Sequence, residues 1–147
     1  VFTMISTGLR ISELCQLDIN DMKNELTIRG KGGKLRMVFL SDVCLSILRK
    51  YVFGRTDMSQ ALLVDNSGKR IYPRLVQYKM ESYSKKLGFR IHPHLLRHYY
   101  STNLLNNGAN LYSVQKLLGH SSITTTERYL HITNKELQNV YTKFSIL

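Results

Sequence analysis

A pair of glycines between two β-prone runs is the feature that most restricts the fold of this chain. The runs Glu25 to Gly30 and Leu35 to Leu40 flank the turn Lys31-Gly32-Gly33-Lys34. Glycine adopts the left-handed conformations that tight turns need, so we expect an antiparallel hairpin here. Leu62 to Val64 is a candidate for a short third strand, because the turn Asn66-Ser67-Gly68 follows it.

Apolar residues at helical spacing mark most of the remaining chain. Ser41 and Asn110 can cap helices through their side chains. Pro73 and Pro93 suit the first turn of a helix. The expected apolar faces consist of Ile11, Leu14 and Leu17; Leu45, Leu48 and Val52; Val76, Met80, Tyr83 and Leu87; and Leu137, Val140 and Phe144. We also expect a helix around Thr124 to Tyr129. The sequence therefore predicts a mainly α domain with a small antiparallel β-sheet, an α+β fold.

An excess of basic side chains indicates a polyanionic partner. The 147 residues include 21 Lys and Arg against 10 Asp and Glu, a formal net charge of +11, and nucleic acid is the commonest partner of so basic a protein. No apolar run approaches the roughly 20 residues that span a bilayer, and no signal peptide is visible. We therefore expect a cytoplasmic protein that does not enter a membrane. Cys15 and Cys44 lie far apart in apolar contexts, which favours reduced core residues over metal ligands.

His94 and Arg97 lie three residues apart near the start of the predicted Pro93 helix, so their side chains share a face. The free N–H groups of a helix start attract anions, and an arginine there can bind phosphate through two parallel hydrogen bonds. A solvated polar face is the alternative. His94 and His98 have a spacing that zinc ligands use, but the arginine between them opposes a cation. We therefore expect no metal site.

Four further residues carry a weaker signal when each is taken alone. Arg10 precedes Glu13 by three residues, which is also the spacing of an ordinary surface ion pair. Lys31 lies at the hairpin tip, where the glycines leave room for a ligand, although most lysines at such tips serve solubility. His120 follows an expected helix end, and Tyr129 lies nine residues further on.

Taken in order, these pieces resemble the catalytic domain of the tyrosine recombinases, the phage-integrase family. The resemblance is to bacterial and archaeal Xer-type enzymes and to integrases of phages and transposons. It extends from Thr7 to about His131, most of the chain. Four blocks carry it: Thr7-Gly8-Leu9-Arg10-Ile11-Ser12-Glu13-Leu14, Gly30-Lys31-Gly32-Gly33-Lys34, His94-Leu95-Leu96-Arg97-His98, and Leu117-Leu118-Gly119-His120 with Tyr129 after it.

The resemblance implies a DNA strand-breaking and rejoining enzyme, with a role for each matching residue. Tyr129 would attack the scissile phosphate and form a 3′-phosphotyrosyl link. Arg10 and Arg97 would hold the non-bridging oxygens as charge develops. Lys31 would protonate the leaving 5′ oxygen, with Lys34 as a second candidate for that role.

The histidines and one carboxylate complete the implied site. His94 would take part in proton transfer, and His120 would hydrogen-bond the phosphate. Glu13 would support the first arginine, and His98 would be structural. Cationic side chains would take the place of a metal ion, so neither a metal nor another cofactor is expected.

The resemblance also implies partners and a wider architecture. The partner would be double-stranded DNA, and the full-length enzyme would act on it as a homo-tetramer, whereas the isolated chain could be a monomer. Residues 1–147 would be a catalytic domain truncated at its N-terminus, without the DNA-clamping domain that precedes it in the family. The tail, Asn134 to Leu147, would dock on its own domain or on a neighbouring subunit. Expected DNA contacts outside the catalytic set are Lys34, Arg36, Arg74 and Lys79.

The residues leave three other functions open. A chromosome-dimer resolvase would share every motif with an integrase of a mobile element. A non-catalytic DNA-binding regulator with this fold would be expected to lose Tyr129 or an arginine, and all of these positions are filled. An RNA-binding module is less consistent, because the chain lacks an interleaved aromatic stacking motif.

Overall fold

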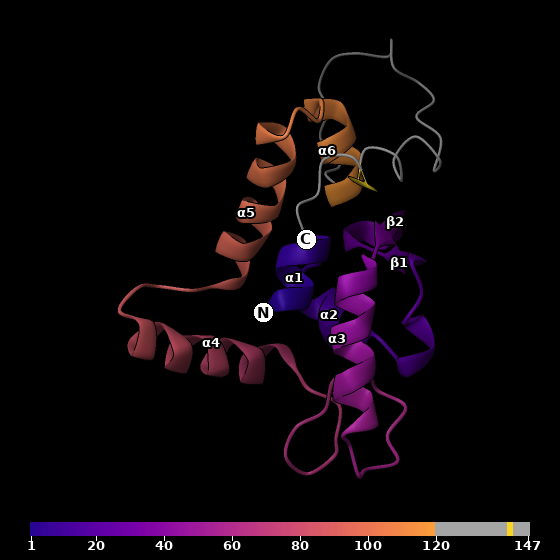
Figure 1. The fold of residues 1–147 in the computed structure, drawn as a ribbon, viewed down its shortest axis with the longest axis vertical. Helices are drawn as coiled ribbons and strands as arrows, with labels where there is room; N and C mark the ends of the chain where they lie inside the picture. The colour runs from indigo at the N-terminus through magenta and orange to yellow at the C-terminus, as the bar shows by residue number, and fades with distance from the viewer. Residues whose placement is uncertain (120–140, 143–147) are drawn as a thin grey trace.

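The computed structural model describes residues 1–119 and 141–142, and the backbone alone of Lys31. In the described part of the chain, helices make up most of the fold, and a two-stranded antiparallel sheet lies at one edge of it (Figure 1). No helix there is long and apolar enough to cross a membrane. The predicted α+β class is therefore confirmed.

The predicted hairpin is present. Strands β1 (Glu25–Arg29) and β2 (Leu35–Phe39) pair with Glu25 opposite Phe39 and Arg29 opposite Leu35. The short 3₁₀ turn η2 (Lys31–Gly33) joins them, and Gly32 and Gly33 have φ angles of 74° and 76°. These values explain why the turn needs glycine.

The expected third strand is wrong. Val64 forms only an isolated bridge with Arg70, and Leu62 lies fully buried in the core. The Leu62 backbone N–H donates to the Leu17 carbonyl at 2.8 Å, and its own carbonyl accepts from Arg55. These single contacts replace the ladder that a strand would need.

The opening of the chain forms two short helices, α1 (Phe2–Thr7) and α2 (Ile11–Gln16), and a 3₁₀ turn, η1 (Ile19–Asp21), follows. Gly8 ends α1 in the left-handed conformation, with φ 63°. The sharp change of direction there puts Arg10 at the N-cap of α2.

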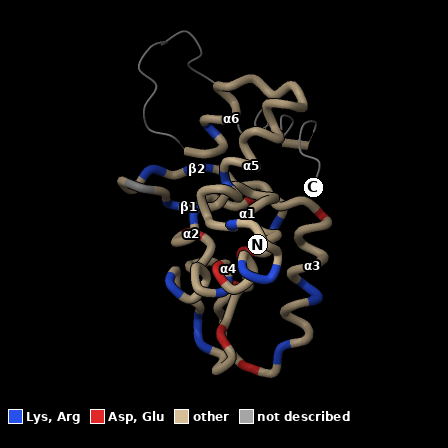
Figure 2. Tube along the Cα trace, turned by 90° about the vertical axis from the view of Figure 1, so that its left-hand side faces the viewer, with Lys and Arg blue, Asp and Glu red and all other residues tan. Residues whose placement is uncertain are grey.

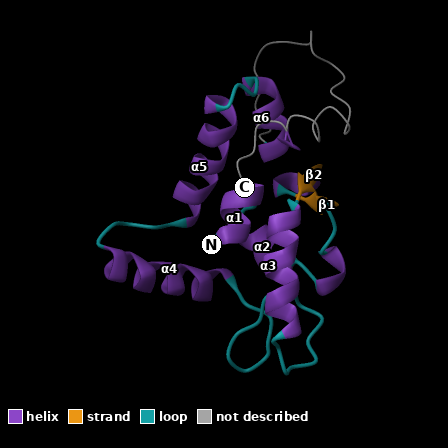
Figure 3. Cartoon of the chain, in the orientation of Figure 1, coloured by secondary structure: helices purple, strands orange, loops and turns teal. Residues whose placement is uncertain are grey.

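Helices α3 (Asp42–Phe53) and α4 (Pro73–Leu87) begin where the capping residues predict. The Ser41 hydroxyl accepts from the Cys44 backbone N–H at 3.2 Å. Figure 3 shows α4 extending away from the other helices. Consequently only Met80 of its predicted apolar stripe is buried, while Tyr83 and Leu87 are 50% and 58% exposed.

Helices α5 (Pro93–Asn106) and α6 (Leu111–Leu118) also begin as predicted. Asn110 caps α6 by accepting from the Ser113 N–H at 2.8 Å, and Gly119 ends the helix with φ 63°. Helix α5 packs against α1 and α6, and α6 packs against β2. The end of α6 is thereby brought next to the start of α2 and to β2.

Two apolar clusters hold these elements together. The first contains side chains from α1, α2, α3 and both strands, with Met80 of α4 and Leu96 of α5. The second joins β2, α5 and α6 to Tyr141, whose ring stacks on Phe39 at a centroid distance of 5.7 Å. Cys15 and Cys44 are buried and free, as predicted. Burial raises the pKa of Cys15 to about 11, so this thiol is protonated at neutral pH.

Of the predicted tail helix, the structure describes only Tyr141 and Thr142, which are helical. The expected helix around Thr124 to Tyr129 lies outside the described residues, as do Leu137, Val140 and Phe144.

Candidate active site

The candidate site is built around Glu13 in the first turn of α2. Its Oε2 accepts from the Arg10 backbone N–H at 2.7 Å, and its Oε1 accepts from Arg10 Nη1 at 2.9 Å. The Arg10–Glu13 pair thus caps α2 and fixes the arginine side chain at the same time. It is not the isolated surface pair that the spacing alone allows, because the Glu13 side chain is only 6% exposed.

A second arginine reaches Glu13 from the hairpin. Arg36 of β2 donates through Nη2 to Glu13 Oε2 at 2.8 Å, and its side chain is 5% exposed. Burial of the carboxyl group opposes its ionisation, but the Arg10 hydrogen bonds and the charge of Arg36 outweigh burial. The pKa of Glu13 therefore lies below its usual range, and the carboxylate is ionised at neutral pH.

Arg97 enters the same region from α5. It donates through Nη1 to the Gly8 carbonyl and through Nη2 to the Leu118 carbonyl. Burial, and then the neighbouring charges of Arg10 and Arg36, lower its pKa to about 10. Arg97 therefore keeps its positive charge at neutral pH, although it lies among other cations.

All three guanidinium groups donate hydrogen bonds to carbonyls at the C-terminal end of α6. Arg36 donates to the Leu117 carbonyl, Arg97 to the Leu118 carbonyl, and Arg10 Nη2 to the Gly119 carbonyl at 3.5 Å. The last carbonyls of a helix have no partner within the helix and carry its negative dipole end. Cationic donors at this end are thus favourable, and they bring together residues from α2, β2 and α5.

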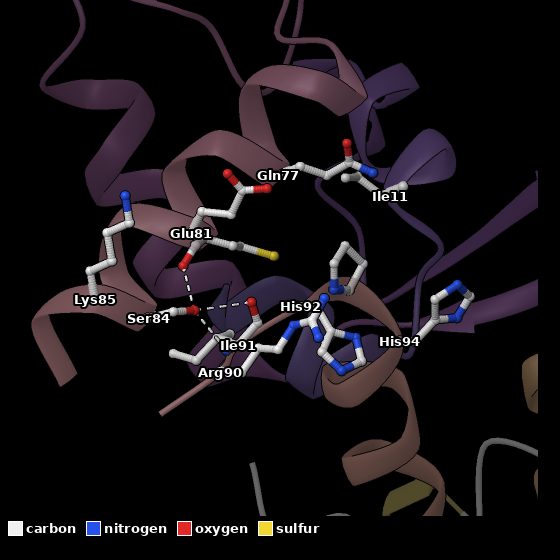
Figure 4. A pocket seen from close by; sticks show the side chains of 11 residues that line it. Ile11, Gln77, Glu81, Ser84, Lys85, Arg90, Ile91, His92 and His94 are labelled. Atoms are coloured by element: carbon white, nitrogen blue, oxygen red, sulfur yellow. Dashed lines mark hydrogen bonds between the residues drawn. The ribbon is translucent and has the colours of Figure 1, made fainter. Parts of the chain in front are cut away.

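His94 and His98 lie on α5, and His92 precedes the helix as its N-cap. His94 is exposed and lines a pocket of about 810 Å³ between α4 and the start of α5 (Figure 4). His92, which the sequence analysis did not identify, caps α5 by accepting from the Leu95 N–H at 3.3 Å. The Ser84 hydroxyl on α4 accepts from the Ile91 N–H at 2.7 Å, which fixes the segment that leads into α5.

The remaining predicted residues fall into two groups. His120 and Tyr129 lie outside the described residues, and so does the side chain of Lys31. Lys34, Arg74, Lys79 and His98 are exposed. Within residues 1–119 and 141–142, no group of three or more His, Cys, Asp or Glu side chains is arranged as a metal site.

Arg36 requires a correction. We expected it to contact DNA, but both of its terminal nitrogens bind protein groups in the interior. The alternation of side chains along a strand could have predicted this burial, because Arg36 lies two residues before the buried Val38 on the same face of β2.

Comparison with known proteins identifies the family. The model of the phage integrase family matches residues 1–136. This chain belongs to that family. The tyrosine recombinase XerA of Pyrococcus furiosus is 38% identical to it, with the match covering 100% of this chain and 54% of the relative. The tyrosine recombinase XerC of Chlorobaculum parvum is 39% identical, covering 92% and 45%. The chain thus spans about half the length of these relatives.

Solved structures of the family share the fold. The crystal structure of a XerA recombinase is 30% identical and superimposes with a TM-score of 0.71, covering 95% of this chain and 54% of that one. A XerH recombinase bound to a palindromic difH substrate is 28% identical with a TM-score of 0.70, covering 95% and 43%. The integrase of mycobacterium phage Brujita, 22% identical with a TM-score of 0.73 and covering 97% and 49%, supports the fold alone. The predicted family and fold are therefore confirmed.

Proposed function

We propose that this chain is the catalytic domain of a site-specific DNA recombinase or integrase that cleaves and rejoins strands through a 3′-phosphotyrosyl intermediate. One observation carries the proposal beyond family membership. Arg10 and Arg97, from helices distant in sequence, converge on the adjacent carbonyls of Gly119 and Leu118. Two guanidinium groups on adjacent carbonyls support a shared site for the non-bridging oxygens of one phosphate.

In the proposed reaction, the phenolic O–H of Tyr129 gives its proton to a base, for which His94 is the candidate, and the oxygen attacks the scissile phosphorus. The bond from phosphorus to the 5′ oxygen breaks, and Lys31 gives that oxygen its proton. Arg10 and Arg97 stabilise the charge that develops on the phosphate. The phosphoester energy is kept in the tyrosyl link, so attack by a 5′ hydroxyl rejoins the strand without ATP.

Supporting groups complete the proposed site. Glu13 holds Arg10 through both of its oxygens, and we assign it a positioning role. His94, exposed at the start of α5, takes part in proton transfer. His120, which follows Gly119 in the sequence, hydrogen-bonds the phosphate.

Double-stranded DNA is the proposed partner. The net charge of +11 suits a polyanion, and Figure 2 shows basic residues on the β1–β2 hairpin and in the second half of α3. The similar XerH structure contains a difH substrate. We further propose a homo-tetramer on DNA and a place in the cytoplasm, where an enzyme that acts on a prokaryotic chromosome or mobile element would meet its substrate.

Trapping of the covalent intermediate tests the proposal. The intact native protein is incubated with nicked suicide DNA that carries a family-like core site, and the DNA-linked peptide is mapped by mass spectrometry. We expect an adduct on Tyr129, and we expect Tyr129→Phe to abolish the adduct while DNA binding persists. An adduct on another residue, such as Tyr99 or Tyr112, would contradict the assignment of the nucleophile.

A further inference from the structure

Arg36 occupies an unusual place for a basic residue in a DNA-binding site. It is buried behind Glu13, and the carboxylate separates it from Arg10, since Arg10 Nη1 binds Oε1 and Arg36 Nη2 binds Oε2. Burying a guanidinium group is costly unless it is paired and hydrogen-bonded. The pairing with Glu13 offsets much of that cost and ties β2 to α2, while Nε has no hydrogen-bond partner among the described residues.

The other terminal nitrogen of Arg36 binds the last turn of α6. Nη1 donates to the Leu117 carbonyl, one of the carbonyls that the helix leaves without a partner. The contact is close: a Cβ atom on Gly119 would lie 2.4 Å from Arg36 Cδ and 3.2 Å from Nε. Gly119 is therefore required both by its positive φ angle and by the aliphatic part of Arg36.

These contacts suit arginine and not lysine. The planar guanidinium group presents donors in two fixed directions, so one side chain can bind Glu13 and Leu117 together. A lysine ammonium group on a flexible stem would keep the charge but not the fixed bridge. Because its side chain is only 5% exposed, Arg36 is not accessible to a DNA phosphate.

We infer that Arg36 is a positioning residue for DNA cleavage: it fastens the end of α6 to Glu13, and thereby places the Gly119 and Leu118 carbonyls against the phosphate-binding Arg10 and Arg97. The inference rests on the proposed function, because it assigns Arg10 and Arg97 to the phosphate. The chain continues from Gly119 to His120 and, nine residues later, to Tyr129. Displacing the end of α6 therefore changes the starting point of the segment that carries both residues.

The first test separates positioning from DNA binding and from stability. Arg36→Met removes the bridge, Arg36→Lys keeps the charge without it, and Arg55→Met is the matched control. Arg55 is also a poorly exposed arginine, at 8%, that binds Asp57 and backbone carbonyls, but in the loop after α3. The intact native protein is assayed for its single-turnover rate of adduct formation at saturating suicide DNA, and for DNA affinity by gel shift.

We expect Arg36→Met to slow cleavage on the order of 100-fold, the effect of a misplacement of about 1 Å, with unchanged DNA affinity. Arg36→Lys should be similarly slow, and Arg55→Met should cleave at the wild-type rate. Full activity of Arg36→Lys would show that charge suffices and would overturn the positioning role. A loss of DNA affinity in Arg36→Met without a change in rate would overturn it as well.

A second variant covers the case in which Arg36→Met does not fold. Gly119→Ala disturbs the same contact from the side of α6 and should also slow cleavage. Gly88→Ala is its control, because Gly88 has φ 74° but no atom within 4 Å of the added Cβ. Equal cleavage rates for the two glycine variants would contradict the inference.

Hydrogen exchange provides a readout that does not depend on activity. Arg36→Met should speed amide exchange at Leu117 to Gly119, whereas Arg55→Met should not. Unchanged exchange in Arg36→Met would overturn the role of Arg36 even if wild-type protein cleaves DNA. Absence of any adduct with wild-type protein would instead overturn the proposed function, and the exchange result would still decide whether Arg36 holds α6.

Discussion

Gly8 lies directly against the ring of Tyr100, so that a Cβ atom at position 8 would be 2.5 Å from Tyr100 Cδ1. The same glycine has φ 63°, and its carbonyl accepts from Arg97. Gly8 therefore joins α1, α5 and the turn that leads to Arg10. A side chain here would disturb two of the proposed phosphate ligands together.

Gly8→Ala should consequently destabilise the domain. The left-handed conformation costs roughly 1–2 kcal/mol for a residue with a Cβ atom, and overpacking against Tyr100 adds about 1–3 kcal/mol. Urea unfolding measures the free energy difference. Gly88→Ala is the control, because it has φ 74° without a close neighbour and should show only the conformational cost. Equal losses in the two variants would mean that the Tyr100 ring simply moves aside.

Stability should fall in acid through Glu13. The pKa of this carboxyl is lowered in the folded protein, so its contribution is complete above the unfolded-state pKa, near 4.5, and is lost as pH falls through the lower folded-state value. Unfolding of wild type and Glu13→Gln across this range provides the comparison. The stability of wild type should decline more steeply than that of the variant, with the exposed Glu25→Gln as control. Parallel curves for wild type and Glu13→Gln would argue against an ionised, paired Glu13.

Cleavage should continue in excess EDTA. Arg10 and Arg97 already supply positive charge where the phosphate would lie, and the pKa of Arg97, about 10, keeps it charged at neutral pH. The yield of covalent adduct is measured with EDTA and with added magnesium. A strict dependence on magnesium would show that the arginines do not suffice.

DNA binding should weaken with salt, and the slope should identify which basic residues contact phosphates. Each lost phosphate contact reduces the slope of log K against log salt by about 0.9. Alanine variants of Lys34, Arg74 and Lys79, all exposed, are expected to reduce it, and binding titrations at several salt concentrations measure the change. Any variant whose slope equals that of wild type removes that residue from the interface.

Tyr141 should stabilise its own domain. Its hydroxyl donates to the Ser6 carbonyl at 3.1 Å, and its ring stacks on Phe39. Truncation of a buried aromatic side chain costs about 3–5 kcal/mol, so Tyr141→Ala should lower the free energy of unfolding of the monomeric chain by a similar amount. Unchanged stability of the monomer would favour docking on a neighbouring subunit. Gel-shift cooperativity on a two-site duplex, with and without the residues after Thr133, then tests exchange of the tail between subunits.

Local chemistry made several elements predictable from the sequence. The hairpin depends on Gly32 and Gly33, which can adopt positive φ angles, and the starts of α3 and α6 depend on the caps Ser41 and Asn110. These signals involve residues within a few positions of each other. The order of the four motif blocks identified the family, and the comparisons confirmed it.

Long-range packing decided what local patterns could not. Leu62 packs in the core and is not part of a strand, because its backbone N–H donates to the Leu17 carbonyl and its carbonyl accepts from Arg55. The stripe on α4 stayed partly exposed, because periodicity shows which residues share a face but not whether another element covers it. From the sequence, Arg36 resembles any other basic surface residue. In the structure, β2 places it between Glu13 and Leu117. The sequence by itself determined the hairpin and the starts of α3, α4, α5 and α6. The convergence of Arg10, Arg36 and Arg97 arose only when α2, β2 and α5 packed against the end of α6. Arg10 pairs with Glu13 three residues away. The other partners of these three arginines lie 21 to 109 residues away, so only packing of the whole chain brings them together.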